Sequence, residues 1–89
     1  MRASPRYIGL DLGGTNIKWC VVEQSGPDGW HTLDRGQVTT DRAGRDEGIV
    51  TQLCVLATDV RDSVTDGPVL TCGVAVPGLY IPDTGVVTF

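Results

Sequence analysis

Residues 7–23 constrain the fold more than any other part of the chain, because two short strands meet there at a glycine-rich turn. Apolar residues alternate with others from Tyr7 to Leu12, and this period of two is typical of a β-strand. Gly13-Gly14-Thr15-Asn16 follows as a turn, since glycine and asparagine accept the positive φ values that a tight reversal requires. Ile17 to Glu23 is rich in β-branched and aromatic residues and is predicted to form the second strand of a hairpin.

The hydrophobic pattern changes twice after this hairpin. Trp30 to Thr39 is polar, which predicts a third strand with one wet face or near a sheet edge. From Gly48 to Val64 apolar residues recur every three or four positions, as in a helix. Val69 to Val76 is nearly all apolar, which predicts a strand buried on both faces and parallel to the first. A turn at Asp83-Thr84-Gly85 and the start of another strand at Val86 follow. The predicted fold is α/β, in the order β-β-β-α-β, with an antiparallel meander and then a parallel strand.

Composition excludes several classes of protein. The 89 residues, 40% hydrophobic and 20% charged, indicate one small globular domain. Eleven acidic residues against seven basic ones lack the positive footprint of a nucleic-acid binder. Three cysteines without a CxxC pair, and a single histidine, argue against a disulfide framework or a zinc site within these residues. With no apolar run long enough for a secretion signal or a membrane span, we expect a soluble, cytoplasmic protein without membrane or nucleic-acid partners.

The hairpin turn is also the segment that best predicts chemistry. Glycines let a backbone approach a phosphate closely and direct N–H groups at its oxygens, and Thr15 adds a hydroxyl donor. Asp11, at the end of the first strand, is placed to hold a hydrated Mg²⁺ ion. The sequence contains neither G-x-x-x-x-G-K-[ST] nor G-x-G-x-x-G, so a hairpin cradle is favoured over a strand-to-helix phosphate loop. An ordinary hairpin with a glycine-rich tip remains the structural alternative.

A second motif occurs one helix downstream, where Pro77-Gly78 ends the apolar strand. Together, Asp11-Leu-Gly-Gly-Thr-Asn-Ile-Lys18, Gly73-Val-Ala-Val-Pro-Gly78 and Asp83-Thr-Gly-Val-Val87 resemble the ROK family (repressors, open reading frames and sugar kinases). The likeness covers residues 6–89. The first motif is also similar to hexokinases and other bacterial glucokinases, but the later segments favour ROK. The resemblance implies a ribonuclease-H-like (actin-like ATPase) fold, in which residues 1–89 form the amino-terminal part of one lobe, with residues 1–6 disordered.

The resemblance also implies ATP-dependent phosphorylation of a hexose, most often glucose, with ATP and Mg²⁺ as cofactors. It assigns Asp11 to Mg²⁺ through water, and Pro77 and Gly78 to the sugar. The residues that it assigns to the nucleotide phosphates, besides Asp11, are Gly13, Gly14, Thr15 and Asn16. Asn16 stands where members of the family often carry Lys.

The remaining parts of such a kinase would follow Phe89. They comprise the catalytic base, the residues that grip the sugar and a Cys/His motif for structural zinc, so we expect these 89 residues alone to be catalytically inactive. We also expect this segment either to self-associate through the apolar strand or to be partly molten, and the protein to be a homo-oligomer. Two alternatives stay open, a sugar-sensing domain of a ROK repressor and a non-kinase actin-like ATPase. Repressors place a helix-turn-helix domain first, whereas only six residues precede Tyr7 here, so the kinase is favoured if Met1 is the natural start.

Overall fold

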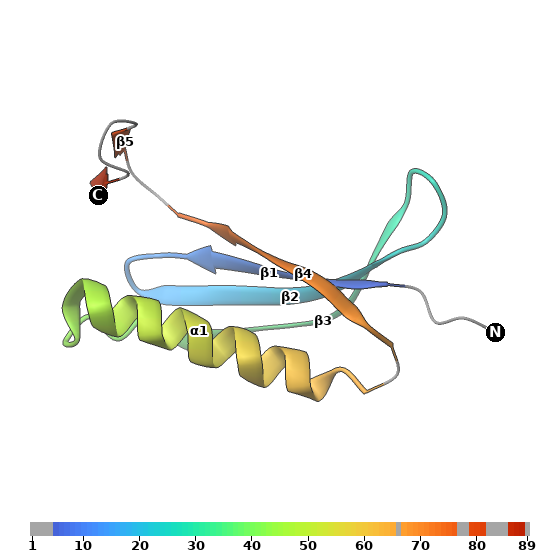
Figure 1. Cartoon of the computed structure of the whole chain (residues 1–89), viewed down its shortest axis with the longest axis horizontal. Coiled ribbons are helices and arrows are strands. Elements are labelled where there is room, and N and C mark those ends of the chain that lie inside the picture. The colour runs from blue at the N-terminus through green and yellow to red at the C-terminus, as the bar shows by residue number, and fades with distance from the viewer. Residues whose placement is uncertain (1–4, 66, 77–78, 82–85, 89) are drawn as a thin grey trace.

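The computed structural model describes residues 5–65, 67–76, 79–81 and 86–88, and it combines a mixed four-stranded sheet with one helix (Figure 1). The chain is therefore an α/β protein. Strands β5 and β6 pair antiparallel in a separate two-stranded sheet. The elements are β1 (Arg6–Leu12), β2 (Asn16–Gln24), β3 (Trp30–Thr39), α1 (Arg45–Ser63), β4 (Val69–Ala75), β5 (Leu79–Ile81) and β6 (Val86–Thr88).

The topology confirms the predicted order of elements. In the main sheet the strands lie in the order β3-β2-β1-β4, with β1–β2 and β2–β3 antiparallel and β1–β4 parallel. The polar strand β3 is at one edge, as predicted. Because β1 and β4 are parallel, their carboxyl ends lie at the same end of the sheet, where the turn after β1 and the start of α1 also lie (Figure 1). The turn of the first predicted motif, Asp11–Lys18, therefore lies at this end of the sheet. The described part of the second motif, Gly73 to Val76, lies at the same end.

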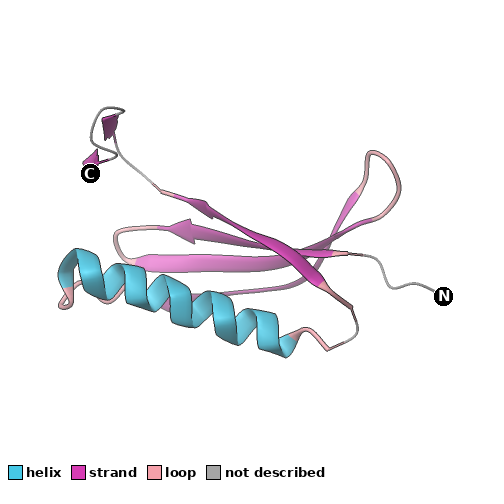
Figure 2. Ribbon diagram, viewed as in Figure 1, coloured by secondary structure: helices cyan, strands magenta, loops and turns pink. Residues whose placement is uncertain are grey.

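One face of the sheet packs against α1 and forms the core (Figure 2). Successive residues of a strand point to opposite faces, so the alternation read from the sequence puts the apolar residues of β1 on the helix side. Ile17, at the start of β2, has no exposed surface at all. The buried hydrophobic residues are Ile8, Leu10, Leu12, Ile17, Val21, Leu56 and Val60.

Helix α1 begins at Arg45, before the predicted start at Gly48. Its first residues are charged and so resemble a loop in the sequence, but acidic side chains are favoured in the first turn of a helix by the helix dipole. Gly44 precedes the helix without a side-chain cap. Among the described residues, no helix has the length and apolar character that crossing a membrane requires.

Strand β1 begins at Arg6, so the disorder expected for residues 1–6 does not extend to this residue. Arg6 is buried, and its Nε lies 3.3 Å from Oε2 of Glu23 on β2. Its backbone N–H also donates to the carbonyl of Pro68, at 2.9 Å, just before β4 begins. These contacts join the start of β1 to both neighbouring strands. Residues 1–4 lie outside the described residues.

Strand β4 departs from its prediction. Its apolar sequence predicted burial on both faces, but six of its seven residues are exposed and it forms an edge of the sheet. Leu70 is 60% and Val74 46% exposed. The prediction was wrong because an apolar run shows only that a strand can be buried. Among the described residues, β4 has β1 on one side and no strand on the other.

We expect the Leu70→Lys/Val74→Lys double variant to be monomeric under conditions where the wild-type chain self-associates. A long apolar edge strand without charges pairs readily with other strands, and lysines on such an edge prevent this. Light scattering coupled to size-exclusion chromatography measures the mass over a range of concentrations. The matched control is Val50→Lys/Val55→Lys, which changes two exposed valines on α1 and should leave the association intact. A wild-type chain that is monomeric, with a melting temperature independent of concentration, would contradict the expectation.

Candidate functional site

The turn between β1 and β2 is closed by a backbone hydrogen bond in which Gly13 N–H donates to the carbonyl of Asn16 at 2.9 Å. A Cβ on Gly13 would lie 2.7 Å from that carbonyl oxygen, closer than a real side chain can approach. Glycine is therefore required here by a close contact. The predicted reason was wrong, because among the described residues only Gly26 and Arg45 have a positive φ.

Gly14 and Thr15 form the exposed tip of this turn. Within the part of the chain that the structure describes, the amide N–H groups of these two residues donate no hydrogen bond. A Cβ on Gly14 would meet no atom within 4 Å, so open space surrounds the backbone there. Adjacent exposed amides of this kind are suited to bind an anion.

The other side of the turn is held by Thr40, which follows β3 and is 6% exposed. Its hydroxyl donates to the Gly13 carbonyl at 2.8 Å, and its backbone N–H donates to the Thr15 carbonyl at 2.8 Å. Sequence reasoning did not identify Thr40, which lies far from the turn along the chain. In the sequence, Thr40 is only a threonine at the end of a predicted strand. It comes close to the turn because Asn16 of β2 pairs with Thr39 of β3.

Asp11 lies next to the turn on the face of the sheet opposite α1. It pairs in register with Lys18 of β2 and with Ala75 of β4, close to the carboxyl ends of β1 and β4. The side chain is exposed, and the described residues give its carboxylate no hydrogen bond or ion pair. An exposed carboxylate without a partner suits hydrated Mg²⁺, which keeps several waters and uses few protein ligands. No cluster of three or more potential metal ligands occurs among the described residues.

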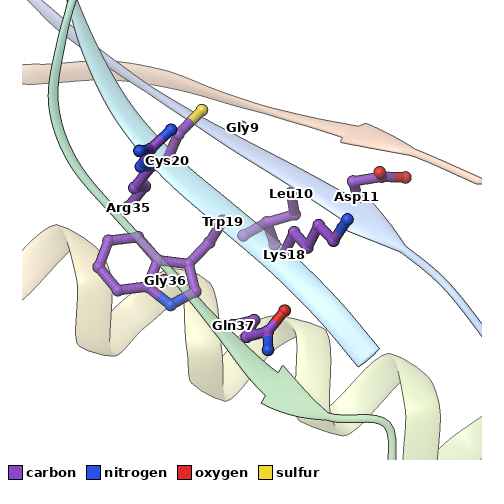
Figure 3. Close-up of a pocket in the computed structure, with 9 residues that line it drawn as sticks. All are labelled: Gly9, Leu10, Asp11, Lys18, Trp19, Cys20, Arg35, Gly36 and Gln37. Atoms are coloured by element: carbon purple, nitrogen blue, oxygen red, sulfur yellow. The ribbon is translucent and has the colours of Figure 1, made fainter. Parts of the chain in front are cut away.

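A shallow hollow of about 590 Å³ extends from Asp11 across the same face of the sheet (Figure 3). Its volume lies within the usual range for small-molecule sites, about 300–1,000 Å³. Asp11 and Lys18 lie towards one end of the hollow, and Cys20 and Arg35 towards the other (Figure 3). The lining residues are Gly9, Leu10, Asp11, Lys18, Trp19, Cys20, Arg35, Gly36 and Gln37. The turn residues do not line the hollow, so Asp11 is the residue that connects the two features.

The second predicted motif is described only as far as Val76. Pro77 and Gly78, which were predicted to face a sugar, and the turn at 83–85 lie outside the described residues. Cys72 on β4 is exposed, but partial burial raises the pKa of its thiol. A raised pKa lowers the thiolate fraction at neutral pH, which makes Cys72 a poor nucleophile.

No family model matches the sequence, and no curated protein shows significant similarity to it. The chemistry of the chain is therefore inferred from the geometry at residues 11–16 and from the motifs themselves.

Proposed function

We propose that this chain is the amino-terminal, phosphate-binding part of an ATP-dependent sugar kinase of the ROK type. The proposed acceptor is a hexose, and glucose is the first candidate. The observation that carries the proposal is the pair of amides at Gly14 and Thr15, which donate no hydrogen bond to any described residue and lie near the exposed carboxylate of Asp11. The ribonuclease-H-like half-lobe is part of the same proposal. The antiparallel hairpin followed by a parallel strand is compatible with it.

In this proposal the residues of the turn bind and orient the nucleotide. Phosphoryl transfer depends mainly on positioning and on neutralising the charge of the transferred group. The amides of Gly14 and Thr15, with the Thr15 hydroxyl, donate hydrogen bonds to phosphate oxygens. Asp11 is the residue that would hold Mg²⁺ through its bound waters, and the ion would offset phosphate charge.

Other roles follow from the motif alone. Asn16 completes the phosphate loop, and Pro77 and Gly78 face the sugar. The catalytic base and any structural zinc belong to sequence after Phe89, so the described residues supply binding rather than proton transfer. We place the protein in the cytoplasm, since both substrates are cytoplasmic metabolites. We also expect it to be a homo-oligomer.

Gly14→Ala is expected to weaken binding of Mg²⁺·ATP by about tenfold, or about 1.4 kcal/mol, while the free energy of unfolding stays nearly unchanged. The added methyl meets no protein atom and requires no change of φ, but it occupies space beside the exposed amides. Isothermal titration of the wild-type and variant chains with ATP, with and without Mg²⁺, measures the effect.

The matched control is Gly48→Ala, another glycine where a Cβ would meet open space, but on α1. It should bind ATP like the wild type. Binding by Gly14→Ala equal to that of the wild type would contradict a phosphate at this turn, and a wild-type chain without measurable affinity for Mg²⁺·ATP would overturn the proposed function.

Phosphoryl transfer from ATP to the sugar is tested on a protein that also contains the sequence encoded after Phe89. Formation of glucose 6-phosphate from ATP and glucose is the expected result, and these 89 residues alone should form none. ATP hydrolysis that does not depend on sugar would favour the non-kinase ATPase. Sugar binding without any use of ATP would favour the repressor.

A further inference from the structure

We propose that Thr40 is a positioning residue that orients the phosphate-binding amide of Gly14 by holding the peptide groups on either side of the turn tip, and that Gln52 of α1 fixes Thr40 in place. This inference rests on the proposed function, because it concerns the same turn. It adds the residue that follows β3 and a residue of the helix, neither of which belongs to the motif at residues 11–16.

The hydroxyl of Thr40 fixes one peptide group of the turn. The Gly13 carbonyl that accepts its hydrogen bond belongs to the same planar peptide unit as the Gly14 N–H. In a trans peptide the C=O and N–H point in opposite directions. Holding the Gly13 carbonyl towards Thr40 therefore turns the Gly14 N–H away from Thr40, to the side where it is exposed.

The backbone of Thr40 fixes a second peptide group. Its N–H donates to the Thr15 carbonyl at 2.8 Å, and that carbonyl shares a peptide unit with the N–H of Asn16. One residue therefore sets the orientation of two peptide planes on either side of the turn tip. Because Thr40 is buried, both bonds are shielded from competition with water.

Gln52 holds the backbone on both sides of Thr40. Its Nε2 donates to the Thr39 carbonyl at 2.7 Å, and its Oε1 accepts from the Asp41 N–H at 2.8 Å. A single side chain on α1 thus fixes the residues before and after Thr40. The path of hydrogen bonds runs from the helix through the residues around Thr40 to the two peptide groups that flank the turn tip, one of which carries the Gly14 N–H.

Three variants of the full chain test the inference by titration with Mg²⁺·ATP, alongside urea unfolding. Thr40→Val keeps the volume and removes the hydroxyl, and we expect about tenfold weaker binding. Thr40→Ser keeps the hydroxyl and loses a methyl, and should bind within about twofold of the wild type. Gln52→Met removes both hydrogen bonds, and because methionine favours the helix as glutamine does, α1 should be retained. We expect this variant to bind Mg²⁺·ATP about threefold more weakly than the wild type. A role in packing alone would give the reverse order for the two Thr40 variants, because serine, not valine, loses volume.

The outcomes distinguish this inference from the proposed function. A wild-type chain that binds no ATP overturns both. If the wild type binds ATP and Thr40→Val binds it equally well, the orienting role of the hydroxyl is wrong while the proposed function stands. Should Thr40→Val fail to fold, Thr40→Ser and Gln52→Met decide, and either weak binding by Thr40→Ser or wild-type binding by Gln52→Met overturns the inference.

Discussion

Replacing Asp11 with Asn is expected to remove most of the Mg²⁺ dependence of ATP binding and to weaken binding of Mg²⁺·ATP by about 10- to 100-fold. The substitution keeps the shape of the side chain but removes the negative charge, and hydrogen bonds to charged groups contribute about 1.5–3 kcal/mol each. Titration with ATP at several Mg²⁺ concentrations measures the effect. Because the Asp11 carboxylate is exposed and has no partner among the described residues, stability should barely change.

Asp59→Asn is the matched control for this prediction. Asp59 is an exposed carboxylate on α1, also without a recorded partner among the described residues, and its loss changes the net charge of the chain by the same amount. If both variants weaken Mg²⁺·ATP binding equally, the effect is not specific to the carboxylate beside the turn, and Asp11 has no specific role with the metal.

Ile17→Ala should have the largest effect on stability, a loss of about 2–5 kcal/mol. Ile17 is the one described hydrophobic side chain with 0% exposure, and it belongs to a small core cluster with residues of β1 and α1. Total stability scales at about 0.05–0.15 kcal/mol per residue, so a chain of this size has about 4–13 kcal/mol to lose. The loss is therefore a large fraction of the total, and the midpoint of unfolding should fall markedly. Urea unfolding followed by far-UV circular dichroism gives the shift in midpoint.

Leu33→Ala tests whether the size of that loss depends on burial. Leu33 is 41% exposed on β3, so removing its side chain should change stability by less than about 1 kcal/mol. A loss for Ile17→Ala no greater than that for Leu33→Ala would mean that the core is not packed between the sheet and α1 as described.

The sequence predicted the features that depend on interactions between neighbouring residues, and it missed those that depend on contacts between distant residues. β3 runs from Trp30 to Thr39 as expected, and β1 and β2 differ from prediction only at their ends. These boundaries follow from alternation and from turn residues that act within a few positions of each other. The position of Asp11 at the end of a strand, beside a glycine turn, could be read in the same way. That none of the described residues pairs with its carboxylate could not be read, because that depends on how Lys18 and the next strand are placed.

By itself, the sequence determined the hairpin, the helix, the parallel return of β4 and the place of Asp11 beside the Gly-Gly-Thr-Asn turn. Only the tertiary structure decided that β4 is an exposed edge, that Gly13 is required by contact with Asn16, and that Thr40 orients the turn. Local patterns arise from the backbone preferences of neighbouring residues. The contact between Thr40 and Gly13 joins residues 27 positions apart, and no short-range preference encodes such a contact before the sheet has formed.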